Sequence, residues 1–391
     1  MSWSNVALST LVDIKGGGTP SKANPEYWNG SIPWASVKDF KSSDLNGASD
    51  YITQEGIDNS ATSLIPRGNL IVPTRMALGK IAINSVDIAI NQDLKALIIK
   101  DESVVDTEYL FRCIQSKSEE IVRQGKGATV KGITVDVLKN LQIPLPPLET
   151  QKQIAKVLEQ ADQLRKDCKL LEQELNSLAQ SVFIDMFGDQ LTSSHEVLGN
   201  VSNVVSGVTK GQKHNNKVIV KVPYMRVANV QAGYLNLNEI KEIEVKESDV
   251  EKYKLEVGDV LLTEGGDHDK LGRGAIWNGE VDNCIHQNHV FRVRLNTELY
   301  TSQWFNGYLK TDFAKRYFLK CAKKTTNLAS INITQLKGLP MPNVDIKEQV
   351  RFEKIMTSIN SKIISNAELA HEYDENFNAL MQKAFKGELN L

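Results

Sequence analysis

The chain has 391 residues, of which 41% are hydrophobic, 24% charged and 7% aromatic, and its formal net charge is −2. This length and composition predict an ordinary globular protein with room for two domains and their connectors. The nearly balanced charge excludes a uniformly basic chain, so any affinity for nucleic acid must come from local patches.

The cysteines and the N-terminal residues indicate the cellular compartment in which the protein works. The chain has no Cys-x-x-Cys pair, and its four cysteines are scattered: Cys113, Cys168, Cys284 and Cys321. This favours reduced thiols and a cytoplasmic location. The opening MSWSNVALSTLVDIKGGG lacks the basic region and apolar core of a signal peptide. No run approaches the length of a membrane span, so none is predicted.

Residues 15–34 read KGGGTPSKANPEYWNGSIPW and share letters with two known motifs. A phosphate-binding P-loop requires GxxxxGK[ST] between a strand and a helix. Counting from Gly16, the sixth position is Ser21, and Ala23 follows Lys22. Residues 24–27, Asn-Pro-Glu-Tyr, resemble the Asn-Pro-Pro-Tyr/Phe of adenine methyltransferases, but no apolar strand precedes them. The stretch therefore meets the requirements of neither motif.

Residues 150–187 predict a long helix, because they follow the Pro-rich segment IPLPPLE and contain no Gly or Pro. Apolar residues recur at alternating spacings of three and four, which is typical of a coiled-coil seam. The predicted seam is Ile154, Val157, Ala161, Leu164, Cys168, Leu171, Leu175, Leu178 and Val182. At about 1.5 Å per residue, such a helix is about 57 Å long.

A glycine-rich turn and a cluster of one cysteine and two histidines lie between this helix and a second long helix that is predicted further along the chain. Cys284, His286 and His289 are close enough in sequence to suggest a metal, although strand alternation points them in different directions and no further ligand pair is near. The turn GGDHDKLGRG, residues 265–274, has no nucleophile at a catalytic spacing. We therefore predict neither a metal centre nor a catalytic site here.

A second long helix is predicted over about residues 346–386, again with alternating spacings of four and three. Its seam is Phe352, Met356, Ile359, Ile363, Asn366, Ala370, Tyr373, Phe377, Leu380 and Ala384. A buried amide at Asn366 would fix the register of a helix pair. Either the two long helices pair with each other, or each packs only on its own domain.

The chain repeats itself at a distance of about 195 residues, which is too long for a solenoid and indicates two related domains. Four blocks match in order, with Ile90-x-Gln92 aligned to Ile285-x-Gln287 in the third: 31–37 with 221–227, 66–72 with 256–262, 88–94 with 283–289, and 133–154 with 331–350. If the two long helices pair, this repeat makes them antiparallel, with the domains at opposite ends about a pseudo-twofold axis.

Basic charge is concentrated in three runs with few or no acids, although the chain as a whole is slightly acidic. These are residues 123–131 (RQGKGATVK), 207–226 and 310–324, and the first and third occupy matching positions of the repeat. Loops of Gly, Lys and Thr can approach phosphates with backbone N–H and ammonium groups. The runs predict contact with nucleic acid.

These residues together resemble the specificity (S) subunit of type I restriction–modification systems, over nearly the whole chain. The resemblance rests on residues 16–34, the turn TEGGDHDKLGRGAIWNG (263–279), the strand CIHQNHVFRV (284–293), and the two LKxL…PxP…Q entries to the long helices. The first domain departs from the pattern, since it has LGKIAI (78–83) in place of the GRGAIW form.

The resemblance implies an α+β fold with two mixed α/β target-recognition domains separated by two long antiparallel coiled-coil helices. The implied segments are the first domain (1–148), the central helix (149–190), the second domain (191–344) and the C-terminal helix (345–391). Each domain would read one half of a split duplex DNA site. The helices would set the gap and dock two methyltransferase (M) subunits, and restriction (R) subunits would join for cleavage. The chain itself would be non-catalytic, with S-adenosylmethionine, ATP and Mg²⁺ on its partners.

Cations within or beside the basic runs are the candidate DNA contacts, because they hold phosphates and can read base edges. In the first domain they are Lys22, Arg75, Lys80, Lys126 and Lys131. In the second they are Lys210, Lys213, Arg226, Lys270, Arg273 and Lys324. Trp34 and Tyr224 occupy equivalent places in the repeat and are expected in the core. Two other interpretations stay open: a coiled-coil scaffold that binds only protein, and a self-sufficient DNA methyltransferase or nuclease.

Overall fold

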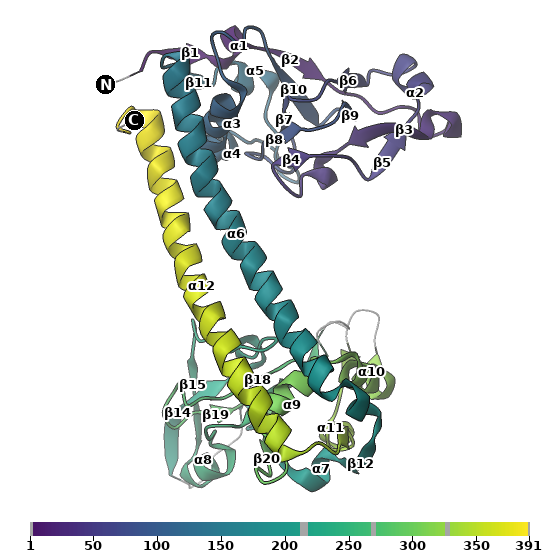
Figure 1. Cartoon of the computed structure of the whole chain (residues 1–391), viewed down its shortest axis with the longest axis vertical. Helices are drawn as coiled ribbons and strands as arrows, with labels where there is room; N and C mark the ends of the chain where they lie inside the picture. Colours follow the sequence, from purple (N-terminus) through teal and green to yellow (C-terminus); the bar gives the residue numbers. More distant parts are fainter. Residues whose placement is uncertain (1–2, 212–217, 267–270, 325–328, 390–391) are drawn as a thin grey trace. The chain divides into compact units, whose positions relative to one another are not determined.

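The computed structural model describes residues 3–211, 218–266, 271–324 and 329–389. The chain divides into two compact units. Unit 1 comprises Met1–Lys169 with Glu368–Leu391, and unit 2 comprises Leu170–Ala367. Two long helices, α6 (Leu148–Phe187) and α12 (Ile346–Lys386), each contribute to both units (Figure 1). No described helix is both long and apolar enough to cross a membrane.

Within the part of unit 1 that the structure describes there are three open sheets, with strand orders β2-β10-β7-β8-β4, β5-β3-β9-β6 and β1-β11. Their strands are β1 (Asn5–Ala7), β2 (Val12–Gly16), β3 (Trp28–Ala35), β4 (Asp44–Leu45), β5 (Asp50–Ile52), β6 (Ser63–Ile65), β7 (Leu70–Pro73), β8 (Ala82–Asn84), β9 (Ile88–Ile90), β10 (Leu94–Ile99) and β11 (Gln142–Pro144). The short helices are α1 (Leu8–Leu11), η1 (Pro25–Tyr27), η2 (Val37–Asp39), α2 (Gln54–Asp58), α3 (Thr107–Ser116), α4 (Ser118–Arg123) and α5 (Val135–Lys139).

The described residues of unit 2 form four open sheets, with strand orders β13-β20-β16-β18, β15-β14-β19, β17-β22-β21 and β12-β23. Their strands are β12 (Ser194–Val197), β13 (Ser202–Ser206), β14 (Ile219–Met225), β15 (Lys241–Lys246), β16 (Val260–Thr263), β17 (Gly265–Gly266), β18 (Gly274–Ile276), β19 (Ile285–His286), β20 (Val290–Leu295), β21 (Lys323–Lys324), β22 (Ala329–Ser330) and β23 (Pro340–Pro342). The short helices are η3 (Gly188–Thr192), α7 (Leu198–Val201), η4 (Val227–Asn229), α8 (Glu247–Tyr253), α9 (Ser302–Leu309), α10 (Asp312–Cys321) and α11 (Ile333–Lys337).

The strand registers confirm the internal repeat. Ile71 pairs with Ala82 across β7 and β8, and Leu261 pairs with Ala275 across β16 and β18. Likewise, Trp34 lies beside Ala89 in a parallel pair, as Tyr224 lies beside Ile285. Trp34 and Tyr224 are both buried, as expected. The predicted mixed α/β architecture is therefore present in both units.

One block of the predicted repeat was wrong by one residue. Ala35 pairs with Ile90 in unit 1, whereas its counterpart Met225 pairs with His286 in unit 2. His286 therefore occupies the place of Ile90, and the shared Ile-x-Gln letters do not mark equivalent positions. A slip of one residue turns every side chain of a strand to its other face, so the pairing decides the alignment.

The glycines near the start of each domain serve close backbone packing. A Cβ atom at Gly17 would lie 2.1 Å from the carbonyl oxygen of Ile90, and one at Gly207 would lie 2.0 Å from that of His286. Only glycine permits these approaches. Asn24, in the methyltransferase-like tetrapeptide, caps η1 by accepting a hydrogen bond from the backbone N–H of Glu26 at 3.1 Å.

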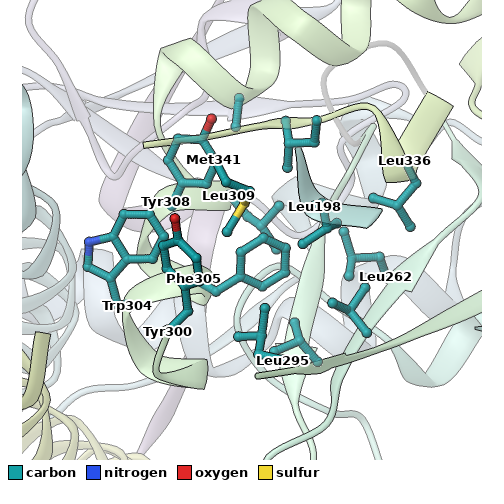
Figure 2. Packing of buried hydrophobic residues seen from close by; sticks show 14 of the residues in the cluster. Leu198, Leu262, Leu295, Tyr300, Trp304, Phe305, Tyr308, Leu309, Leu336 and Met341 are labelled. Carbon is teal, nitrogen blue, oxygen red and sulfur yellow. The ribbon is translucent and has the colours of Figure 1, made fainter. Parts of the chain in front are cut away.

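The core of unit 2 is rich in aromatic residues from α9, which pack between the sheet and the long helices (Figure 2). The rings of Trp304 and Tyr308 stack with centroids 5.3 Å apart, and the Tyr308 hydroxyl donates to the carbonyl of Pro340 at 2.6 Å. From α6, Phe183 meets Phe352 of α12 edge-on at 5.4 Å. The C-terminal part of α6 thus lies against the N-terminal part of α12 in this unit.

In unit 1 the opposite ends of the same helices share one core. Ile154 and Leu158 of α6 belong to a buried cluster with Phe377 and Met381 of α12. Since N-terminal residues of each helix meet C-terminal residues of the other, the predicted antiparallel pairing is confirmed within each unit.

The predicted seam holds for α12 and fails in part for α6. Every predicted seam position of α12 is buried or half-buried. On α6, however, Leu164, Leu171 and Leu178 are 44%, 44% and 48% exposed. The ends of α6 instead bury residues at spacings of four, such as Ile154 and Leu158. A straight helix drifts relative to a strict 3.5-residue repeat, and here each end turns toward its own domain.

A glutamine fixes the start of each long helix to the domain before it. The side chains of Gln151 and Gln349 are fully buried. The Gln151 Oε1 accepts from the backbone N–H of Asp106, the N-cap of α3, at 2.9 Å. In the same way, the Gln349 Oε1 accepts from that of Thr301, the N-cap of α9, at 2.9 Å. The repeat thus includes the junctions with the helices.

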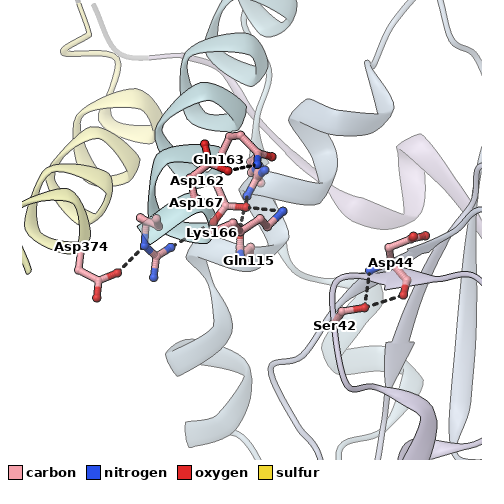
Figure 3. A network of polar contacts seen from close by, with 10 residues as sticks. Ser42, Asp44, Gln115, Asp162, Gln163, Lys166, Asp167 and Asp374 are labelled. Atoms are coloured by element: carbon pink, nitrogen blue, oxygen red, sulfur yellow. Dashed lines mark hydrogen bonds and ion pairs between the residues drawn. The ribbon is translucent and has the colours of Figure 1, made fainter. Parts of the chain in front are cut away.

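A buried ion pair joins α3 to α6 in unit 1 (Figure 3). Arg112 Nη1 lies 3.1 Å from Asp162 Oδ2, and the two side chains are only 5% and 12% exposed. Lys166 and Arg165 approach the same carboxylate at 3.2 and 3.3 Å. Arg165 also covers the ring of Phe377 at 4.4 Å. Desolvation alone would raise the pKa of Asp162, but Arg112 and Lys166 outweigh it and the pKa is lowered.

Candidate nucleic-acid interface

A short loop in unit 1 presents two of the predicted lysines to solvent. We name residues 126–132 the first basic loop. Lys126 and Gly132 exchange both backbone hydrogen bonds, each at 2.9 Å, and so close the loop. Gly127 adopts a φ of +129°, and a Cβ there would lie 2.2 Å from the carbonyl oxygen of Val130. Glycine therefore allows the tight turn that exposes Lys126 and Lys131.

The first basic loop docks beside the turn that follows β7. The backbone N–H of Ile133 donates to the carbonyl of Thr74 at 2.9 Å, and Gly132 packs against the Arg75 side chain. Arg75 is 66% exposed and its Nη1 lies 3.8 Å from Asp93 Oδ1, so this weak pair leaves the guanidinium accessible. The structure thus brings together Arg75, Lys126 and Lys131, three of the five predicted cations of the first domain.

Unit 2 builds the same arrangement from β17, β22 and β21. We name residues 323–330 the second basic loop, of which residues 325–328 lie outside the described part. Ser330 pairs with Lys323 on one side and Gly265 on the other, as Gly132 pairs with Lys126 and Arg75. The backbone N–H of Ile331 donates to Glu264, as that of Ile133 donates to Thr74. Lys323, which is exposed, is therefore the counterpart of Lys126.

Sequence reasoning missed Lys323, although aligning the repeat through the basic runs would have found it. The predicted neighbour Lys324 belongs to β21, but its side chain lies outside the described residues. Lys213 and Lys270 also lie outside them. Lys22 and Lys210 are exposed and form no ion pair with a described residue.

Lys80 and Arg273 hold equivalent places, which aligns the LGKIAI segment of the first domain with the LGRGAI of the second. Both follow a glycine in the left-handed region, since φ is +81° at Gly79 and +72° at Gly272. Lys80 Nζ donates to the carbonyl of Phe40 at 3.0 Å, and Arg273 Nη1 donates to Gln231 Oε1 at 3.4 Å. Each cation thus ties the β7–β8 or β16–β18 turn to the loop after η2 or η4.

Arg226 is engaged with an acid. Its Nη2 donates to Glu239 Oε2 at 2.9 Å and to the Glu239 backbone carbonyl at 2.9 Å. Lys241 approaches the same carboxylate at 3.3 Å. The hydrogen bond from Arg226, followed by that from Lys241, lowers the pKa of Glu239. This contact orders the loop after η4 and partly neutralises Arg226.

The cysteine and histidines of the 284–289 segment play different parts. His286 is fully buried and its Nδ1–H donates to the carbonyl of Val290 at 2.7 Å. Burial lowers the pKa of His286 to about 4 and raises the pKa of Cys284 to about 12. His289 is exposed and lies 2.6 Å from Glu264. Among the described residues, no group of three or more His, Cys, Asp or Glu side chains could hold a metal ion.

The architecture is that of an α+β protein of two compact units, in which Lys126 and Lys323 are exposed at equivalent positions and each unit packs on the long helices. Residues 1–179 match the family model described as the type I restriction modification DNA specificity domain. The MjaIX specificity subunit of Methanocaldococcus jannaschii is 25% identical over all of this chain and 94% of its own. The EcoR124I/EcoR124II specificity subunit of Escherichia coli is 37% identical over 38% of each chain.

Solved structures agree with this fold. The crystal structure of the S subunit of a type I restriction–modification system from M. genitalium aligns over 98% of this chain and 96% of its own, with a TM-score of 0.56 at 18% identity. The predicted resemblance is confirmed: the chain is similar to the specificity subunits of type I restriction–modification systems.

Proposed function

We propose that the chain is a specificity subunit that reads a split duplex DNA site, with one half read by each domain. The observation that carries the proposal is the pair of equivalent basic loops. Lys126 in the first loop and Lys323 in the second occupy the same position, and both are exposed. Two related domains with the same anchored loop are suited to two half-sites of different sequence.

The loop chemistry suits the DNA backbone. Lysine ammonium groups and loop N–H groups contact phosphates, release counterions and position the protein on the duplex. Arg75 lies beside the first loop and has the fork geometry that reads guanine in the major groove. We infer that Arg75, Lys126, Lys131, Lys323 and Lys324 form the cationic surface, with Lys22 and Lys210 extending it.

The other predicted cations have two kinds of role in the proposal. Lys80, Arg226 and Arg273 are tied to groups of the protein, so we propose that they position DNA-contacting loops more than they hold phosphates. Lys213 and Lys270 stay candidate contacts on the strength of their basic and glycine-rich sequence surroundings.

The reactions are assigned to partner subunits. We propose that residues 1–148 and 191–344 act as target-recognition domains, and that the helices of residues 149–190 and 345–391 dock two M subunits. These would bring S-adenosylmethionine to adenines in the two half-sites, and R subunits would supply ATP-dependent cleavage with Mg²⁺. The chain itself would catalyse neither step, in the cytoplasm of its host.

The long helices give the proposal a length scale. The 40 residues of α6 amount to about 60 Å at about 1.5 Å per residue. At about 3.4 Å per base pair, this sets an outer limit of about 17 base pairs on the unread gap. The gap itself is shorter, because each domain has width.

The experiment is DNA binding by the purified chain with its M subunits, followed by fluorescence anisotropy at several salt concentrations. We expect affinity to fall steeply as salt rises. Binding that does not depend on salt, or no binding at all, would instead favour a protein-only scaffold. Methylation or cleavage of DNA by the chain alone, given S-adenosylmethionine and Mg²⁺, would favour a self-sufficient enzyme.

A further inference from the structure

Unit 2 contains a cavity of about 580 Å³, which shares only Arg273 with the cations of the proposed DNA-reading role. Its wall comes from α6, α9, α10 and α12, from the loop of residues 231–234 and from the turn of residues 271–274. The volume falls within the range of about 300–1,000 Å³ that is typical of small-molecule sites.

The charge of this cavity favours an anion. Arg273, Lys310 and Lys315 line it, and its described lining residues include no Asp or Glu. The Nε of Arg273 is buried and has no hydrogen-bond partner among the described residues. Buried donors are nearly always paired, so this N–H calls for an acceptor that the described residues do not supply.

The deeper wall combines an unpaired acceptor with an apolar floor. Asn306 is 7% exposed, and its Oδ1 has no partner among the described residues. Beside it lie the side chains of Phe183, Phe352 and Met356. A ligand that fills this part of the cavity needs an N–H donor on a flat apolar body. Tyr234, which is exposed, adds an aromatic ring to the lining.

Comparison with unit 1 shows that this space arises from two differences in the repeat. Counting six residues from the equivalent N-caps Asp106 and Thr301, Arg112 of α3 corresponds to Gly307 of α9. Gly307 lines the cavity, whereas Arg112 occupies its place with a buried side chain.

The second difference lies on the long helices. The ring of Phe385 contacts Tyr109 in unit 1, as that of Phe187 contacts Trp304 in unit 2. Phe377 lies eight residues before Phe385, and Ala179 lies eight residues before Phe187. Phe377 in unit 1 therefore corresponds to Ala179 in unit 2. Phe377 is buried and lies against the guanidinium of Arg112, while Ala179 lines the cavity.

In unit 1, the space that corresponds to the cavity of unit 2 is therefore filled by the side chains of Arg112 and Phe377. The cavity beside Lys80, the counterpart of Arg273, measures only about 290 Å³, and it is lined by Gln115, the counterpart of Lys310. Two large side chains of unit 1 are thus replaced by glycine and alanine in unit 2, where a cation also replaces the glutamine.

We propose that the cavity of unit 2 binds a nucleoside monophosphate whose base carries an amino group. The phosphate would lie at Arg273, Lys310 and Lys315, where it supplies the acceptor for the Arg273 Nε–H. The base would rest on Phe183 and Phe352 and donate its amino group to Asn306 Oδ1. The inference concerns unit 2 alone and does not depend on how the chain reads DNA.

The test is isothermal titration calorimetry of the full chain with AMP, and with IMP, adenosine and inorganic phosphate in parallel. We expect saturable binding of AMP, with IMP, which lacks the amino group, at least ten-fold weaker. Adenosine and phosphate should each bind at least ten-fold more weakly than AMP. No saturable AMP binding would overturn the proposal and leave the polar atoms of the cavity to water.

Variants of three lining residues, and of one cation outside the cavity, test whether AMP binds in the cavity or elsewhere on the cationic surface. Ala179→Phe, which restores the side chain of unit 1, and Lys315→Gln should each weaken AMP at least ten-fold. Asn306→Leu should abolish the preference for AMP over IMP. Lys320→Gln changes a cation of the same helix, α10, that does not line the cavity, and should leave AMP binding unchanged.

Since Ala179→Phe can disturb packing, circular dichroism must show that each variant is folded. Lys315→Gln changes an exposed side chain and so tests the proposal without this difficulty. AMP binding unaffected by Lys315→Gln and Asn306→Leu would overturn the proposal. Displacement of AMP by any DNA duplex at equal charge would do the same, because the cavity would then be part of the DNA surface.

Discussion

The buried pair of Arg112 and Asp162 holds α3 against α6, and its removal should destabilise unit 1 selectively. Asp162→Asn keeps the size of the side chain but leaves the guanidinium of Arg112, 5% exposed, without its counter-charge. Breaking one side of a buried ion pair typically costs about 3–5 kcal/mol. Lys166 and Arg165 lose the same partner. We therefore expect a loss of about 3 kcal/mol in the free energy of unfolding of unit 1.

A double-mutant cycle separates the pair from the loss of either side chain. The variant Arg112→Met with Asp162→Leu removes both charges and keeps apolar contact with Phe377, so it should lose far less than the sum of its two single changes. Asp167→Asn is the matched control, because Asp167 lies on the same helix and, among the described residues, accepts just one exposed hydrogen bond, from Gln163.

The assay is amide hydrogen exchange during guanidinium titration, which assigns the loss to a region. We expect faster exchange in α3 and the first turns of α6, with α9 unchanged. A loss below about 1 kcal/mol for Asp162→Asn, or additive losses in the double variant, would refute the reasoning that the pair is buried and coupled.

The other predictions concern pH, DNA binding and the gap. The lowered pKa of Asp162 contributes stability that is present above its unfolded pKa, about 3.9, and is lost as the pH falls through its folded pKa. Acid titration should therefore show a step in the free energy of unfolding of unit 1 that the Asp162→Asn variant lacks. Lys126→Gln and Lys323→Gln should each reduce the slope of log affinity against log salt by about 0.9, measured by anisotropy with M subunits present, and an unchanged slope would remove that lysine from the interface. Inserting seven residues into both long helices adds about 10.5 Å to each and should widen the preferred gap by about three base pairs, with the half-site sequences unchanged. Methylome sequencing measures the gap, and an unchanged gap would count against helices that set the spacing.

The long helices and the repeat could be predicted from sequence because both depend on periodic patterns. The predicted first helix, 150–187, differs from α6 (Leu148–Phe187) by two residues at one end. The face of that helix was harder to predict. Leu164, Leu171 and Leu178 follow a seam in the sequence, but packing on each domain decides which side is buried.

The site could be predicted in outline only. The basic run at residues 123–131 located the first basic loop, but the role of each cation depends on partners far away in sequence. Lys80 meets the Phe40 carbonyl 40 residues earlier, and Arg226 meets Glu239. No local pattern reports such contacts. The place of His286 likewise follows from strand pairing, which shifted the alignment by one residue.

Recognition of two separate half-sites in one target is the central part of the proposed function. The measurement is selection of bound sequences from randomised duplex DNA by the chain with its M subunits, followed by sequencing. We expect two short specified blocks separated by an unspecified gap of fixed length below about 17 base pairs. A single contiguous block, or bound sequences without any preference, would contradict it.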